Sequence, residues 1–151
     1  MAISNHISVR TGRLRTKIQF ANVLKQSQQV RSVHFVLHYC LSHLSTDDAK
    51  GALCAVDNCD VRISRLGLII PKRWAKRAVT RSLIKRQCRA EFMSAAGMLP
   101  AGDWIIRLRR SFDQAQWISG ASVALKQCVR QELQGLFQRA CLECADQHGS
   151  L

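Results

Sequence analysis

The sequence lacks acidic residues over long stretches. No aspartate or glutamate occurs before Asp47, and none occurs from Val61 to Ala90, in a chain of 151 residues. Ten acids stand against 23 lysines and arginines, so the formal net charge is +13. A charge of this sign and size favours an anionic partner, and it bears on association and solubility more than on the fold.

Long apolar segments are also missing. No run of about 18 apolar residues occurs, so no membrane span is predicted, and the first residues lack the apolar core of a secretion signal. We therefore expect a cytoplasmic protein. The seven cysteines are odd in number and irregularly spaced, which fits reduced thiols better than a disulfide framework. Cys141, Cys144 and His148 offer only three ligands, whereas structural zinc usually takes four, so no metal site is predicted.

The length and the hydrophobic content of 47% suit one folded domain. We expect this domain over residues 10–145, after a mobile arm at 1–9 and before a tail at 146–151. Residues 42–60 contain four of the ten acids together with turn-forming residues, which indicates a long acidic hairpin loop.

Hydrophobic periodicity predicts the other elements. A short helix is expected at 17–25, capped by Thr16, and a central strand at 33–41, where apolar residues alternate with His34 and His38. A strand at 61–70 should lie antiparallel to it. A helix at 76–96, a strand at 104–109 and a long helix at 112–144 follow. The order αβββαβα indicates an α+β fold in which helices pack on a small, antiparallel-rich sheet.

The basic segment after Pro71 organises the chain. Five cations recur with a four-residue step, and three more stand beside them: Arg73, Arg77, Arg81, Lys85 and Arg89, with Lys72, Lys76 and Arg86. On a helix such a row is continuous, and like charges at this spacing cost a few tenths of a kcal/mol per pair. Nucleic-acid phosphates would neutralise the row. A solvated basic surface helix is the alternative. Apolar residues on the same segment should face the sheet: Val79, Leu83, Ile84, Cys88 and Phe92.

The order of these motifs resembles the protein component of bacterial ribonuclease P. The matching stretches are Arg65-Leu66-Gly67-Leu68, Lys72-Arg73, Ala78-Val79-Thr80-Arg81, Lys85-Arg86-Gln87-Cys88-Arg89 and Phe92. Weaker similarity covers Arg13-Leu14 with Phe20 and Val23, and residues 99–104. The connection before the second strand is usually short in the family, so the acidic loop resembles an insertion at about 43–60. The chain departs from the family where R-N-R is usual, since it has Arg81-Ser82-Leu83, and where a glutamate usually follows the last arginine, since it has Ala90.

The resemblance implies a left-handed βαβ crossover and a role in removing the 5′ leader from precursor tRNA. It implies two RNA partners, a separate catalytic RNA and precursor tRNA, with Mg²⁺ held mainly by the RNA; no obligate protein partner is expected. Phosphate contacts are expected from Arg13, Lys72, Arg73, Lys76, Arg77, Arg81, Ser82, Lys85, Arg86 and Arg89. Phe20 and Phe35 could stack on unpaired leader bases, although Phe20 could equally anchor the core.

The residues themselves reveal no catalytic site. We identify no nucleophile beside a base, no paired carboxylates and no cluster of metal ligands at a spacing typical of a catalytic site. Three rival functions remain: another basic RNA-binding protein of the ribosomal type, a protein-only hydrolase built around His34, His38 and a cysteine, and membrane attachment through the basic helix.

Overall fold

The computed structural model describes residues 9–26, 28–41, 62–112 and 123–149. The elements in chain order are β1 (Val9–Arg13), α1 (Lys17–Lys25), β2 (Gln29–Arg31), β3 (Phe35–Leu41), β4 (Arg62–Ile69), α2 (Ala78–Ala95), β5 (Gly102–Leu108) and α3 (Val123–Gly149). The predicted α+β class is confirmed, and from α1 onward the predicted order holds. No residue range was predicted for the strands β1 and β2. The helix α3 continues to residue 149, past the start of the expected tail, and the acidic insertion lies outside the described residues.

The five strands form one mixed sheet in the order β1-β4-β5-β3-β2. The pairs β2–β3 and β3–β5 are antiparallel, whereas β4–β5 and β1–β4 are parallel. The predicted hairpin between the strands now labelled β3 and β4 is therefore wrong, because β5 lies between them. The residues before β4 connect two strands that are not neighbours, which local sequence patterns do not reveal.

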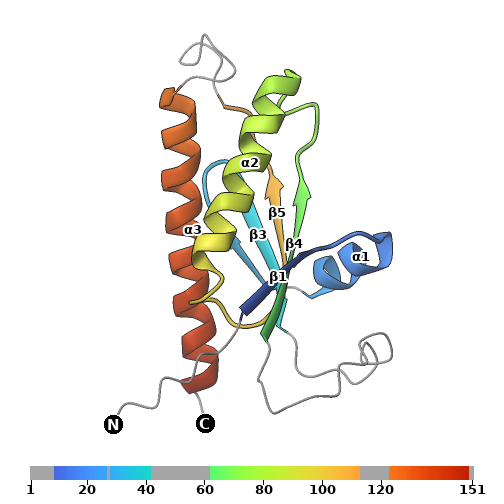
Figure 1. Ribbon diagram of the computed structural model, residues 1–151, viewed down its shortest axis with the longest axis vertical. Coiled ribbons are helices and arrows are strands. Elements are labelled where there is room, and N and C mark those ends of the chain that lie inside the picture. Colours follow the sequence, from blue (N-terminus) through green and yellow to red (C-terminus); the bar gives the residue numbers. More distant parts are fainter. Residues whose placement is uncertain (1–8, 27, 42–61, 113–122, 150–151) are drawn as a thin grey trace.

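The sheet has a thickly covered face and an open face (Figure 1). The helices α2 and α3 pack on the first, where Trp104, Tyr39, Phe35 and Phe92 are almost fully buried. The other face carries α1, and there Leu14, Val23 and Ile105 form a smaller cluster. Each large buried side chain contributes roughly 1.5–3 kcal/mol through removal from water.

The helix α1 begins where the sequence predicts. The Thr16 hydroxyl accepts a hydrogen bond from the backbone N–H of Gln19, and the Gln19 side chain accepts one from the backbone N–H of Thr16. This capping box satisfies amide groups that have no partner within the helix. Val23 is fully buried against the sheet, so the cap and one apolar contact fix the direction of α1.

The connection from β4 through α2 to β5 is left-handed. Figure 1 shows α2 in front of the sheet, with β5 to the left of the parallel strand β4 and both strands running upward. This agrees with the family resemblance and departs from the usual right-handed preference. Ile84, Cys88 and Phe92 face the core as predicted, but Val79 is 57% exposed. The predicted burial of Val79 is wrong because it lies in the first turn of α2, beyond the reach of the core.

Candidate nucleic-acid interface

The segment between β4 and α2 is a folded loop rather than the first turn of a helix. The Pro71 carbonyl accepts hydrogen bonds from the backbone N–H groups of Trp74, at 3.1 Å, and Ala75, at 3.2 Å. Ala75 is buried, and Trp74 packs against the core. We call residues 71–77 the basic loop, because its exposed side chains are Lys72, Arg73, Lys76 and Arg77.

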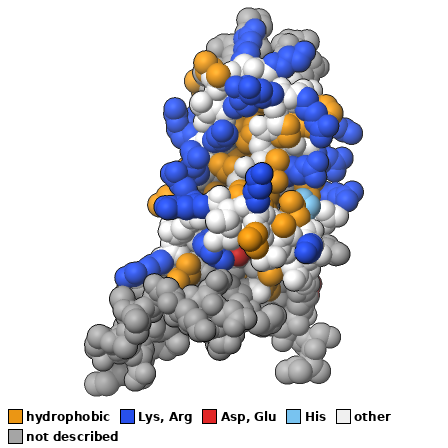
Figure 2. All heavy atoms as spheres, turned by 90° about the vertical axis from the view of Figure 1, so that its right-hand side faces the viewer, with side chains coloured by type: hydrophobic (Ala, Val, Ile, Leu, Met, Phe, Trp, Pro, Cys, Tyr) orange, Lys and Arg blue, Asp and Glu red, His pale blue; other side chains and the backbone are white. Residues whose placement is uncertain are grey.

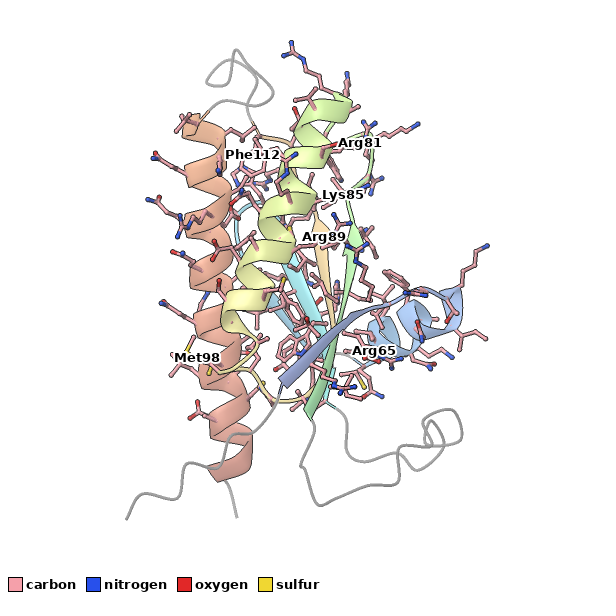
Figure 3. The ribbon with its side chains drawn as sticks, in the orientation of Figure 1. Arg65, Arg81, Lys85, Arg89, Met98 and Phe112 are labelled. Carbon is pink, nitrogen blue, oxygen red and sulfur yellow. The ribbon has the colours of Figure 1, made fainter. Side chains whose placement is uncertain are left out.

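The predicted unbroken helical row of five cations is therefore wrong. Arg73 lies in the loop, where its guanidinium carbon stands 5.1 Å from the centre of the Trp74 ring, and Arg77 is the N-cap of α2. Only Arg81, Lys85 and Arg89 continue the row on the helix, along the side of α2 that faces β4 (Figure 3). The loop and the helix together still present one basic surface.

No described carboxylate lies within this surface. From Arg62 to Ala90 the chain has none, and Glu91, the first, points toward α3. Its Oε1 atom lies 3.2 Å from Nε of Arg130, and Glu91 is only 8% exposed. The positive end of the α2 dipole adds to the charge at the loop. Ser82 and Arg86 are exposed on the same helix, so both predicted contacts are accessible to solvent.

An open hollow of about 410 Å³ lies beside the basic surface. It is bounded by the end of β1, the edge of β4, α1 and α2, and its lining includes Arg13, Phe20, Gly67, Lys85 and Arg89. Phe20 is half-buried and lies against Gly67, where an added Cβ would stand 2.6 Å from the ring. Phe20 therefore packs on the sheet while lining a hollow that also contains cations, the combination that suits an unstacked base and its phosphate.

The predicted stacking role of Phe35 is wrong. Phe35 has no exposed surface, and its ring centre lies 6.0 Å from that of Phe112 within the core under α3. The alternation of β3 left open which face points inward. Packing of α2 and α3 on the side of Phe35, Leu37 and Tyr39 decides it.

The open face of the sheet carries cations that the sequence did not single out. Arg31 and Arg107 are both register partners of Val36, so they flank β3 on the face that carries α1. His38 is on this face, and burial lowers its pKa, with further lowering by Arg107 and then Arg31. Figure 2 shows blue side chains around an apolar centre, with little red between them. Side chains alternate along β5, so Arg107 points away from Ile106, but only strand pairing brings it to the same face as Arg31.

The two histidines of the rival hydrolase lie apart. His34 precedes β3, where its Nδ1 atom is 2.8 Å from Oε2 of Glu132 and its ring stacks on Phe112 at 4.0 Å. His38 faces the other side of the sheet. The structure therefore does not assemble the site that this rival needs. Among the described residues, no three His, Cys, Asp or Glu side chains are close enough to hold a metal ion.

The fold and the surface define a class: a small α+β protein whose crossover loop and helix form a basic face beside a half-exposed aromatic ring. Comparison with known proteins is consistent with this. The family model described as Ribonuclease P matches residues 9–140, and the chain belongs to this family.

Individual relatives agree with this assignment. The chain is 36% identical over 135 residues to the ribonuclease P protein component of Ralstonia pickettii, a match that covers 89% of this chain and 83% of the relative. The match to the component from Burkholderia mallei has 38% identity over 89 residues, and it covers 59% of this chain and 65% of that protein.

Solved structures show the same fold. The RNase P protein of Staphylococcus aureus superposes with a TM-score of 0.60 and 21% identity, covering 87% of this chain and 96% of that one. For the protein from Thermotoga maritima the TM-score is 0.58 and the identity 21%, over 84% and 96% of the two chains. No helix within the described residues is long and apolar enough to cross a membrane.

Proposed function

We propose that this chain is the protein subunit of ribonuclease P, which assists a catalytic RNA in removing the 5′ leader of precursor tRNA. The observation that carries the proposal is the basic face without carboxylates, built from the basic loop and α2 and placed beside the hollow that Phe20 lines. Phosphates of the catalytic RNA neutralise the basic face. Membership of the ribonuclease P family supports the assignment.

The leader of precursor tRNA binds on the side of the sheet that carries α1. Phe20 offers a partly exposed ring for stacking on an unpaired base, an interaction worth roughly 1–3 kcal/mol per base. Arg31 and Arg107 are exposed and supply positive charge on the same face. Single-stranded nucleic acid is bound by this combination of cations and aromatic rings with little dependence on sequence.

In this proposal the active site of the endoribonuclease lies on the RNA subunit, and Mg²⁺ is held mainly by RNA. Mg²⁺ prefers carboxylate, phosphate and water oxygens. Two described carboxylates are already paired with arginines, Asp103 with Arg65 and Glu91 with Arg130. Within the described part of the chain, the basic face is therefore suited to binding phosphates, while these two carboxylates are engaged with arginines.

Reconstitution with the catalytic RNA tests the proposal. The slope of log K against log salt concentration is negative, and the double variant Lys85→Gln/Arg89→Gln should make it shallower by about 1.4 to 1.8. Each lost phosphate contact removes about 0.7–0.9 from its magnitude. Lys126→Gln/Arg139→Gln removes the same charge from exposed positions on α3 and serves as the control. Equal slopes for the two double variants would contradict the proposed RNA face.

The RNA that copurifies with the tagged chain separates the proposal from its rivals. Recovery of a single structured RNA that cleaves precursor tRNA supports the ribonuclease P function. Copurification with ribosomes would instead indicate a protein of the ribosomal type. Cleavage of precursor tRNA by the purified chain without added RNA would contradict the placement of the active site on the RNA.

A further inference from the structure

The side chain of Arg81 points back toward the basic loop. Its Nη1 atom donates hydrogen bonds to the carbonyl oxygens of Ala75, at 2.9 Å, and Lys76, at 2.8 Å. The backbone N–H of Arg81 donates to the carbonyl of Arg77 at 3.1 Å, as the first turn of α2 requires. One residue of the helix thus contacts three successive carbonyls at the junction of loop and helix.

These contacts complete the folding of the loop. The Pro71 carbonyl holds only the first half, through the amides of Trp74 and Ala75. Arg77, the N-cap, makes no capping hydrogen bond with its side chain. The Arg81 guanidinium therefore supplies the side-chain hydrogen bonds that fix the second half, where Lys76 is exposed.

We propose that Arg81 is a positioning residue, which fixes the basic loop so that Lys72, Arg73 and Lys76 meet the phosphates of the bound RNA in one arrangement. The inference rests on the proposed function for the identity of that ligand, but not for the ordering of the loop. A loop already fixed in the free protein loses less conformational entropy on binding. Guanidinium suits this role because its N–H groups are held in one plane, whereas the lysine ammonium is a compact charge on a flexible stem.

Amide hydrogen exchange of the free protein tests the ordering. Arg81→Lys keeps the charge but loses the planar group, and Arg89→Lys makes the same change at an exposed position of α2. We expect Arg81→Lys to speed exchange of the Trp74 and Ala75 amides by at least about tenfold, because local opening of the loop becomes easier. Exchange in β3 and β5 should not change, and Arg89→Lys should match the wild type. Protection of the Trp74 and Ala75 amides in Arg81→Lys equal to that in the wild type would overturn the proposal.

Binding of the catalytic RNA provides the second measurement. Arg81→Lys should weaken binding by about five- to tenfold although no charge is lost. The basic loop of this variant is less ordered in the free protein, so it loses more conformational entropy on binding. Combining it with Lys76→Gln should weaken binding by less than the product of the separate effects, since residues in one network are not additive. Combination with Arg89→Gln should give the full product.

The outcomes separate the two proposals. Wild-type affinity and salt dependence in Arg81→Lys would show that Arg81 acts only as a charge, and would overturn the positioning role. A wild-type chain that binds no catalytic RNA would instead overturn the proposed function, and the exchange data would still decide whether Arg81 orders the loop.

Discussion

The Arg65 guanidinium and the Asp103 carboxylate form a two-point ion pair across β4 and β5. Nε lies 2.7 Å from Oδ1, and Nη2 lies 2.8 Å from Oδ2. The two residues are register partners, and Gly12 lies opposite Arg65 on β1. A Cβ at Gly12 would stand 3.4 Å from Cγ of Arg65. The pair therefore joins β4 to β5 while β1 passes closely beside it.

Asp103→Asn should lower the free energy of unfolding by about 1–2 kcal/mol, because one charge-assisted hydrogen bond is lost and a neutral amide replaces the carboxylate beside Arg65. Urea denaturation measures the change. Asp146→Asn removes an exposed carboxylate from α3 and should change stability by less than about 0.5 kcal/mol. Equal stability of the two variants would mean that the ion pair adds nothing to the sheet.

Glu132→Gln should destabilise the protein by about 2–3 kcal/mol, because hydrogen bonds to a charged group are lost in a partly buried place. The carboxylate accepts from Ser32 Oγ at 2.5 Å and from the backbone N–H of His34 at 2.6 Å, and it contacts His34 Nδ1 at 2.8 Å. Thermal unfolding measures the loss. Gln131→Ala alters the exposed neighbour on α3 and is the control. A similar melting temperature for both variants would mean that the contacts of Glu132 with Ser32 and His34 do not stabilise the fold.

Two glycines should respond in opposite directions to alanine. At Gly67 the new Cβ would stand 2.6 Å from Cε1 of Phe20, so the ring must move, at a cost of about 1–3 kcal/mol. At Gly135, within α3, nothing lies within 4 Å of an added Cβ, and alanine should stabilise the helix by about 0.5–1 kcal/mol. Denaturation midpoints measure both. A stabilising Gly67→Ala would show that the Phe20 ring does not hold this position.

Tyr39 should make stability fall in strong alkali. Burial, with smaller contributions from Cys144 and Glu143, raises its pKa to about 12. The folded state then keeps the phenol proton that the unfolded state loses above pH 10, so the free energy of unfolding falls as pH rises from 10 to 12. The slope approaches about 1.4 kcal/mol per pH unit.

Tyr39 is the single tyrosine of the chain, so phenolate absorbance reports its titration directly. Tyr39→Phe should remove this part of the pH dependence and leave the part that comes from the cysteines, whose pKa values burial also raises. A phenol that titrates near pH 10 in the folded protein would contradict the prediction.

The sequence by itself determined the local elements. The threonine cap and apolar spacing of α1, the run that ends at Pro71, and the apolar strips of α2 and α3 all depend on neighbours within a few residues. The excess of cations over acids after residue 61 is likewise a property of the chain alone. These features were enough to predict an α+β class and a basic face.

Only the tertiary structure decided how these pieces meet. Strand pairing joins residues far apart in the chain, so β5 could enter between β3 and β4, and Arg107 could approach Arg31, without a local signal. The packing of α2 and α3 chose the buried face of β3, which enclosed Phe35 and left His38 on the other side. Arg81 turned toward the carbonyls of Ala75 and Lys76, which only the folded loop brings within its reach. The direction of a side chain follows from its tertiary partners, and a periodic pattern does not contain them.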